Sequence, residues 1–96
     1  MAQFIKMMTL DVLKPQEPGV DTYAEEIAGM KHIDTIKIKL MEIDTKTETV
    51  KIIVEGSGLN LEPIENKIKE LGGTVHSVDE VIASEKDIED TPINYE

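Results

Sequence analysis

Apolar residues recur along this chain with two spacings, every second residue in some segments and every third or fourth in others. The first spacing predicts β-strands and the second predicts amphipathic helices. Segments with the strand pattern, or apolar throughout, are residues 4–13, 33–44, 48–55 and 74–83. Segments with the helical pattern are residues 20–30 and 60–71. The predicted order is strand, helix, strand, strand, helix, strand.

Two of the predicted strands depart from simple alternation. Residues 4–13 are apolar on both faces, which is typical of a central strand. In the last strand Val75, Val78, Val81 and Ile82 do not share one parity, so we expect a β-bulge there.

This order predicts an α+β fold, the ferredoxin-like βαββαβ sandwich. Right-handed crossovers put both helices on one face of a four-stranded antiparallel sheet, with the first and third strands central. We expect the domain to span residues 1–84. Residues 85–96 form an acidic C-terminal tail with little apolar content, which we expect to be dispensable for folding.

The composition argues against several classes of partner and site. Acidic residues number 20 against 10 basic ones, all lysine, for a formal net charge of −10. Such a chain repels nucleic acid and anionic membranes, so neither is an expected partner. The absence of cysteine excludes disulfides, thiolate metal sites and a cysteine nucleophile, and it fits a cytoplasmic protein. Residues 1–13 lack the pattern of a signal peptide or a membrane span.

The strongest candidate for chemistry is a set of residues on the first and last strands, which are neighbours in this fold. These residues are Asp11, His76, Asp79 and Glu80. Carboxylates with one imidazole suit a divalent cation, here calcium or magnesium. The alternative is a hydrogen-bonded histidine beside solvated acids on an edge strand, because alternation points residues three apart to opposite faces.

Other polar clusters give weaker signals. Glu42, Asp44 and Glu48 fit a solvated hairpin tip. The segment Gly56-Ser57-Gly58 lacks the lysine and the glycine spacing of a phosphate-binding loop. No nucleophile with a paired base is fixed by spacing, so no catalytic residue is assigned.

Three stretches resemble one known family. They are LDVLKP at residues 10–15, EID at 42–44 with Thr47-Glu48, and IKELGGTVHSVDEV at 68–81. Together they resemble the archaeal domain-of-unknown-function 211 family. The resemblance implies a small ferredoxin-like protein, oligomeric in character and without an established activity.

Two functions remain open at this point. The first is a non-catalytic homo-oligomeric module with a ligand-sensing or regulatory role, whose small-molecule ligand the sequence does not identify. The alternative is a divalent-metal-binding protein or metal-dependent enzyme. We expect a closed, symmetric homo-oligomer held partly through the sheet face opposite the helices. Strict alternation places five large apolar residues on that face: Ile5, Met7, Met41, Ile43 and Ile53.

Overall fold

The computed structural model describes residues 4–85, and over this range all six expected elements are present. The strands are β1 (Phe4–Pro15), β2 (Ile33–Ile43), β3 (Thr47–Gly56) and β4 (Thr74–Ser84). The helices are α1 (Val20–Ala28) and α2 (Leu61–Glu70). Their ends agree with the sequence prediction to within two residues. The expected acidic tail lies outside the described residues apart from Glu85.

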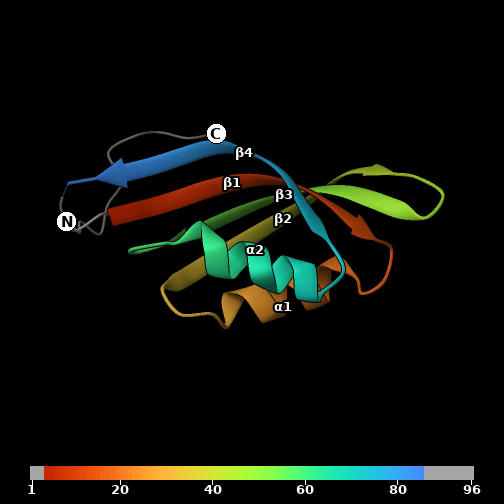
Figure 1. The fold of residues 1–96 in the computed structure, drawn as a ribbon, viewed down its shortest axis with the longest axis horizontal. Helices are drawn as coiled ribbons and strands as arrows, with labels where there is room; N and C mark the ends of the chain where they lie inside the picture. The colour runs from red at the N-terminus through yellow and green to blue at the C-terminus, as the bar shows by residue number, and fades with distance from the viewer. Residues whose placement is uncertain (1–3, 86–96) are drawn as a thin grey trace.

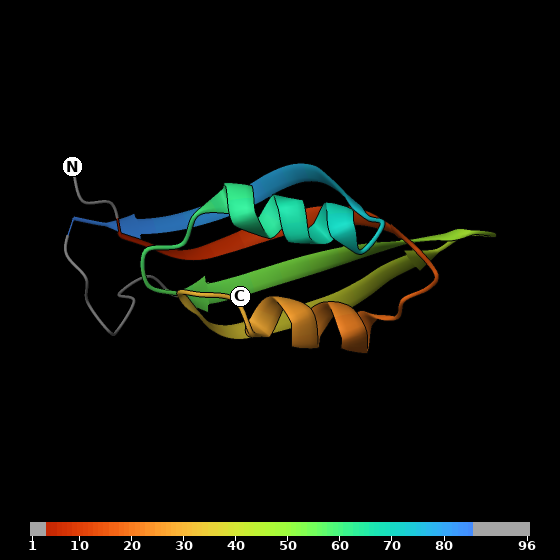
Figure 2. The ribbon, with the colours of Figure 1, turned by 60° about the horizontal axis from the view of Figure 1, so that its bottom comes forward.

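The four strands form one antiparallel sheet in the order β2-β3-β1-β4. Both helices lie on the same face of this sheet, as Figures 1 and 2 show. The ferredoxin-like prediction is therefore confirmed, with β1 and β3 central. We call the other face, which no described helix covers, the open face. No helix in residues 4–85 is long and apolar enough to cross a membrane.

The core lies between the helices and the sheet. Each helix presents two fully or almost fully buried side chains to it, Tyr23 and Ile27 from α1 and Ile64 and Ile68 from α2. The central strands contribute alternate residues, as period-two burial requires. These residues are Met8, Leu10, Val12, Val50, Ile52 and Val54.

The helix ends follow local chemistry. Gly19 precedes α1 without a side-chain cap, whereas the Asn60 side chain accepts a hydrogen bond from the Glu62 backbone N–H at the start of α2. Gly72 follows α2 with a φ of 91°, a conformation that glycine adopts without a Cβ penalty.

The irregular apolar pattern of β4 is explained by bulges. The register between β1 and β4 shifts twice in this stretch, and the shifts leave His76 and Asp79 without a paired partner. As a result, three valines spaced three apart all pair with core residues of β1. The pairs are Val75 with Val12, Val78 with Leu10 and Val81 with Met8. The predicted bulge is confirmed.

Two further register shifts change which of the predicted apolar residues lie on the open face. A shift between Ile5 and Met7 turns Ile5 toward the helices, where it packs against the core. A second shift between Leu40 and Glu42 makes Ile43 pair with Glu48, a residue on the helix side of β3. The assignments of Ile5 and Ile43 to the open face were wrong, because each bulge reverses the alternation beyond it.

Candidate functional site

The open face is the side of the sheet that no described helix covers, and the strand register shows which residues lie on it. From β2 to β4, three rows cross it. The first row is Thr35, Glu55, Met7 and Ile82; the second is Lys37, Ile53, Thr9 and Glu80; the third is Lys39, Lys51, Asp11 and Ser77. Apolar side chains therefore lie near one end of the face and charged ones near its middle.

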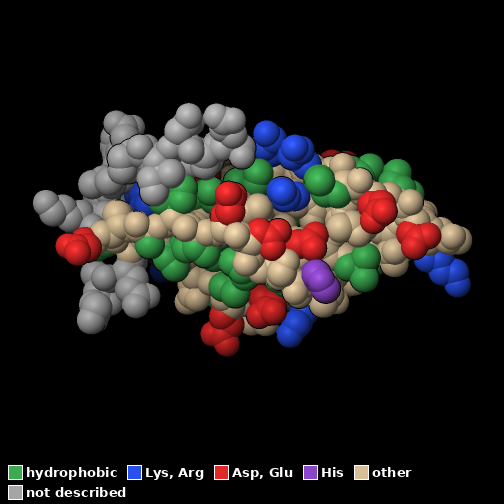
Figure 3. Space-filling view, turned by 90° about the horizontal axis from the view of Figure 1, so that it is seen from above, with side chains coloured by type: hydrophobic (Ala, Val, Ile, Leu, Met, Phe, Trp, Pro, Cys, Tyr) green, Lys and Arg blue, Asp and Glu red, His purple; other side chains and the backbone are tan. Residues whose placement is uncertain are grey.

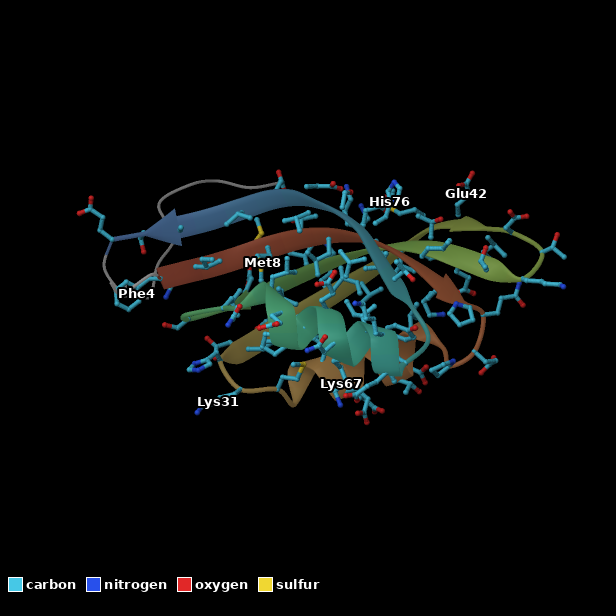
Figure 4. The ribbon with its side chains drawn as sticks, in the orientation of Figure 1. Phe4, Met8, Lys31, Glu42, Lys67 and His76 are labelled. Atoms are coloured by element: carbon cyan, nitrogen blue, oxygen red, sulfur yellow. The ribbon has the colours of Figure 1, made fainter. Side chains whose placement is uncertain are left out.

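The four residues predicted as a metal site lie in the same region of the molecule. Asp11 pairs with Ser77, between the two bulge residues His76 and Asp79 of β4. His76 points away from the helices, as Figure 4 shows. Glu80 lies in the neighbouring row, opposite Thr9. The adjacency of β1 and β4 thus brings these groups to one half of the open face.

These side chains do not converge on one point. The Ser77 hydroxyl donates a hydrogen bond to Asp79 Oδ1 at 2.7 Å, and the Thr9 hydroxyl donates to Glu80 Oε1 at 3.0 Å. Within residues 4–85 no three histidine or acidic side chains are arranged so that they could hold a metal ion. The geometry therefore matches the alternative of solvated acids with local hydrogen bonds, and the metal site stays a prediction.

The charges on the open face are unevenly divided between its two halves, and Glu55 is the acid that lies on β3 beside the lysines. Asp11, Asp79 and Glu80 belong to β1 and β4. In Figure 3, which views the molecule from the side away from the helices, acidic side chains gather along the middle and one group of lysines lies along the upper margin. The lysines Lys37, Lys39 and Lys51 belong to β2 and β3, and Lys39 is the direct cross-strand partner of Lys51. Like charges placed directly opposite each other destabilise a sheet, so the pair of lysines favours a nearby anionic group, which Asp11 supplies to Lys51 from its other side.

A groove of about 320 Å³ lies next to these lysines. Its lining comes from all four strands: Met7, Thr9, Thr35, Lys37, Ile53, Glu55 and Glu80. Met7 and Thr9 are each only 2% exposed, although no described helix covers this face. The groove thus combines the apolar side chains of Met7 and Ile53 with polar and charged groups that could orient an occupant.

A buried ion pair lies on the helix side, and sequence reasoning missed it. Lys14 follows Met8, Leu10 and Val12 in the alternation of β1, and its side chain is 0% exposed. Its Nζ donates to Glu48 Oε1 at 2.8 Å and to the Pro15 carbonyl at 2.9 Å. The Nζ also lies 5.1 Å from the centre of the Tyr23 ring, a distance typical of a cation–π contact. The missed signal was a lysine at a core parity position.

Tyr23 of α1 also contacts the end of α2. Its hydroxyl donates to the Leu71 carbonyl at 2.9 Å. Burial raises the pKa of Tyr23 above its usual 10.0, because desolvation disfavours the phenolate. Glu48, which the sequence grouped with a solvated acidic tip, therefore belongs to a separate buried cluster with Lys14 and Tyr23.

The β2–β3 hairpin forms a projecting arm, which we define as residues 40–46. All seven of these residues are exposed, and Figures 1 and 2 show the hairpin continuing beyond both helices. Leu40, Met41 and Ile43 are 48%, 52% and 63% exposed. The Gln16 side-chain amide holds the turn of the arm by donating to the carbonyls of Asp44 and Thr45 at 2.9 and 3.0 Å.

Comparison with known proteins gives a consistent family. The model of the family described as DUF211, uncharacterized ArCR, matches residues 6–96. The chain is also 43% identical over 86 residues to the uncharacterized protein MJ0319 of Methanocaldococcus jannaschii. That alignment covers 90% of this chain and 89% of the relative.

Proposed function

The chain belongs to the DUF211 family, and from that premise we propose that this protein is a non-catalytic assembly module that works as a closed homo-oligomer. The family description and the name of the relative give no activity. The proposal includes a regulatory or ligand-sensing role, because a protein that catalyses no reaction exerts its function by binding a ligand or another protein.

The observation that carries the proposal is the exposed arm. It holds three of the seven large hydrophobic side chains that are exposed within residues 4–85. β1 pairs with β3 as far as Pro15 with Thr47, so β2 is the outer strand of the arm. Exposed apolar side chains on such an extension favour a protein partner.

A second copy of the chain is the partner that we propose. Leu40, Met41 and Ile43 are already about half covered, so burying the rest of each on two copies would contribute roughly 0.7–1.5 kcal/mol per side chain before the costs of association. Six such side chains contribute roughly 4–9 kcal/mol, which falls within the estimated cost of about 4–15 kcal/mol for lost translation and rotation, so further contacts are required. The outer backbone edge of β2, which is the last strand of the sheet on that side, offers further hydrogen bonds.

Light scattering after size exclusion tests the proposal. We expect a mass that is a multiple of 10.7 kDa at tens of micromolar protein. Ile43→Glu should dissociate the assembly while the far-ultraviolet circular dichroism spectrum stays unchanged, because this side chain is exposed in the folded chain.

Two control variants locate the contact. Val81→Glu changes an equally exposed apolar residue on β4, 51% exposed, and should leave the assembly intact. Ile53→Glu tests the open face in the same way. A wild-type mass near 10.7 kDa would refute the assembly itself, and dissociation by Val81→Glu or Ile53→Glu alone would refute the arm as its contact.

A further inference from the structure

The groove on the open face and the lysines beside it need an occupant of a specific kind. Met7 and Ile53 give the groove an apolar lining, which suits aliphatic or aromatic side chains. Lys37, Lys39 and Lys51 lie along β2 and β3, and within residues 4–85 none of them forms an ion pair. The surface therefore fits a short acidic segment that also carries apolar residues.

This chain contains such a segment outside the described residues. Residues 86–96 read KDIEDTPINYE, with four acids, one lysine and three large apolar residues. We propose that this C-terminal segment packs on the open face of its own chain, with apolar side chains in the groove and acids along the lysines of β2 and β3. The proposal goes beyond assembly through the arm and uses a different surface.

The end of β4 lies within reach of the groove. Ser84 pairs with Phe4, and Met7 lies three residues further along β1, a separation of about 10 Å at the rise of a strand. Eleven extended residues span up to about 36 Å, so the segment is long enough to cross the face and turn. The family match also extends through residue 96, which makes the segment part of the length that the family shares.

The charges of the groove set the orientation of the segment. Glu80 lies on the β4 side of the groove and Lys37 on the β2 side. Glu55 of β3 also lines the groove, so the acids of residues 86–96 should lie along the lysines of β2 and β3 and away from Glu55, Asp11 and Glu80. Added salt should weaken the contact, because exposed charge pairs are screened.

Paramagnetic relaxation in solution tests the proposal directly, and the absence of cysteine makes single-site labelling simple. A nitroxide on Thr91→Cys should broaden the backbone amide signals of Lys37, Lys51 and Ile53 much more strongly than those of α1 and α2. A nitroxide on Glu25→Cys, an exposed position of α1, is the matched control and should reverse this order, with stronger broadening on the helices than on the open face.

Charge variants and a mixing experiment complete the test. The double variant Lys39→Gln with Lys51→Gln should reduce the broadening at least severalfold, and high salt should do the same. Broadening that is weak everywhere, or centred on the helices, would overturn the proposal. Broadening seen only when an isotope-labelled chain is mixed with a separate spin-labelled chain would assign the groove to the segment of a second copy and overturn the assignment within one chain.

Discussion

The ion pair between Lys14 and Glu48 predicts an asymmetric response to mutation. The Lys14 side chain is fully buried, whereas that of Glu48 is 18% exposed. Replacing Glu48 with alanine leaves the lysine charge buried without its carboxylate. Removing one partner of a buried pair costs about 3–5 kcal/mol of folding free energy. Contacts with the Pro15 carbonyl and the Tyr23 ring remain, so we expect a loss of about 2–3 kcal/mol.

Replacing the lysine instead should cost much less. Lys14→Met keeps a long apolar stem in the core and leaves Glu48 near water, so we expect a change within about 1 kcal/mol of wild type. Adding Lys14→Met to Glu48→Ala should then restore most of the lost stability, because it removes the uncompensated charge.

Thermal unfolding followed by circular dichroism measures these differences. For a domain of this size, 1 kcal/mol corresponds to about 4–8 °C in Tm, so Glu48→Ala should lower Tm by roughly 10–20 °C. All variants are compared at one protomer concentration, because association changes apparent stability. Glu25→Ala, at an exposed position of α1, is the control. If the double variant is no more stable than Glu48→Ala, the buried charge is not the cause.

Three further outcomes are expected. Gly56→Ala should destabilise the fold by about 2–4 kcal/mol in urea unfolding, because its Cβ would lie 1.9 Å from the His32 carbonyl oxygen; Gly58→Ala, with open space but a φ of 70°, should cost about 1 kcal/mol, and equal losses would contradict this. Burial raises the pKa of Tyr23, so its contribution is complete below pH 10.0 and is lost as the pH rises through the folded-state pKa; Tyr23→Phe should lose less stability than wild type in that alkaline window, and parallel pH profiles would count against it. The metal hypothesis predicts that calcium or magnesium raises Tm in wild type and less in Asp79→Asn, and it fails if both match their ionic-strength controls.

The sequence was sufficient for the elements and their order because these depend on local spacing. The two helices and four strands follow from apolar periodicity, and the strand order follows from the crossover rule. The bulges of β4 could also be predicted, since Val75, Val78 and Val81 break the alternation visibly. At this level local pattern and global fold agree.

The sequence pattern did not predict which face of the sheet some residues at the ends of β1 and β2 occupy. The bulge at Met41 lies in a run where residues on both sides of the alternation are apolar, so nothing in the pattern marks it. Pairing across strands has the same limit. The contact between Lys14 and Glu48 and the groove around Ile53 both depend on register, which tertiary packing fixes.

The bulge at Met41 also separates two surfaces that regular alternation would have merged. It turns Ile43 to the helix side, beyond the reach of the helices, and thereby leaves the open face with fewer large apolar residues. The arm and the open face can therefore be perturbed independently. Ile43→Glu should abolish association and preserve the broadening caused by the label at Thr91→Cys, whereas Lys39→Gln with Lys51→Gln should do the reverse. If either change alters both the oligomeric mass and the broadening, the C-terminal segment and the second copy share one surface. The separation of the arm from the open face by the bulge would then have no functional consequence.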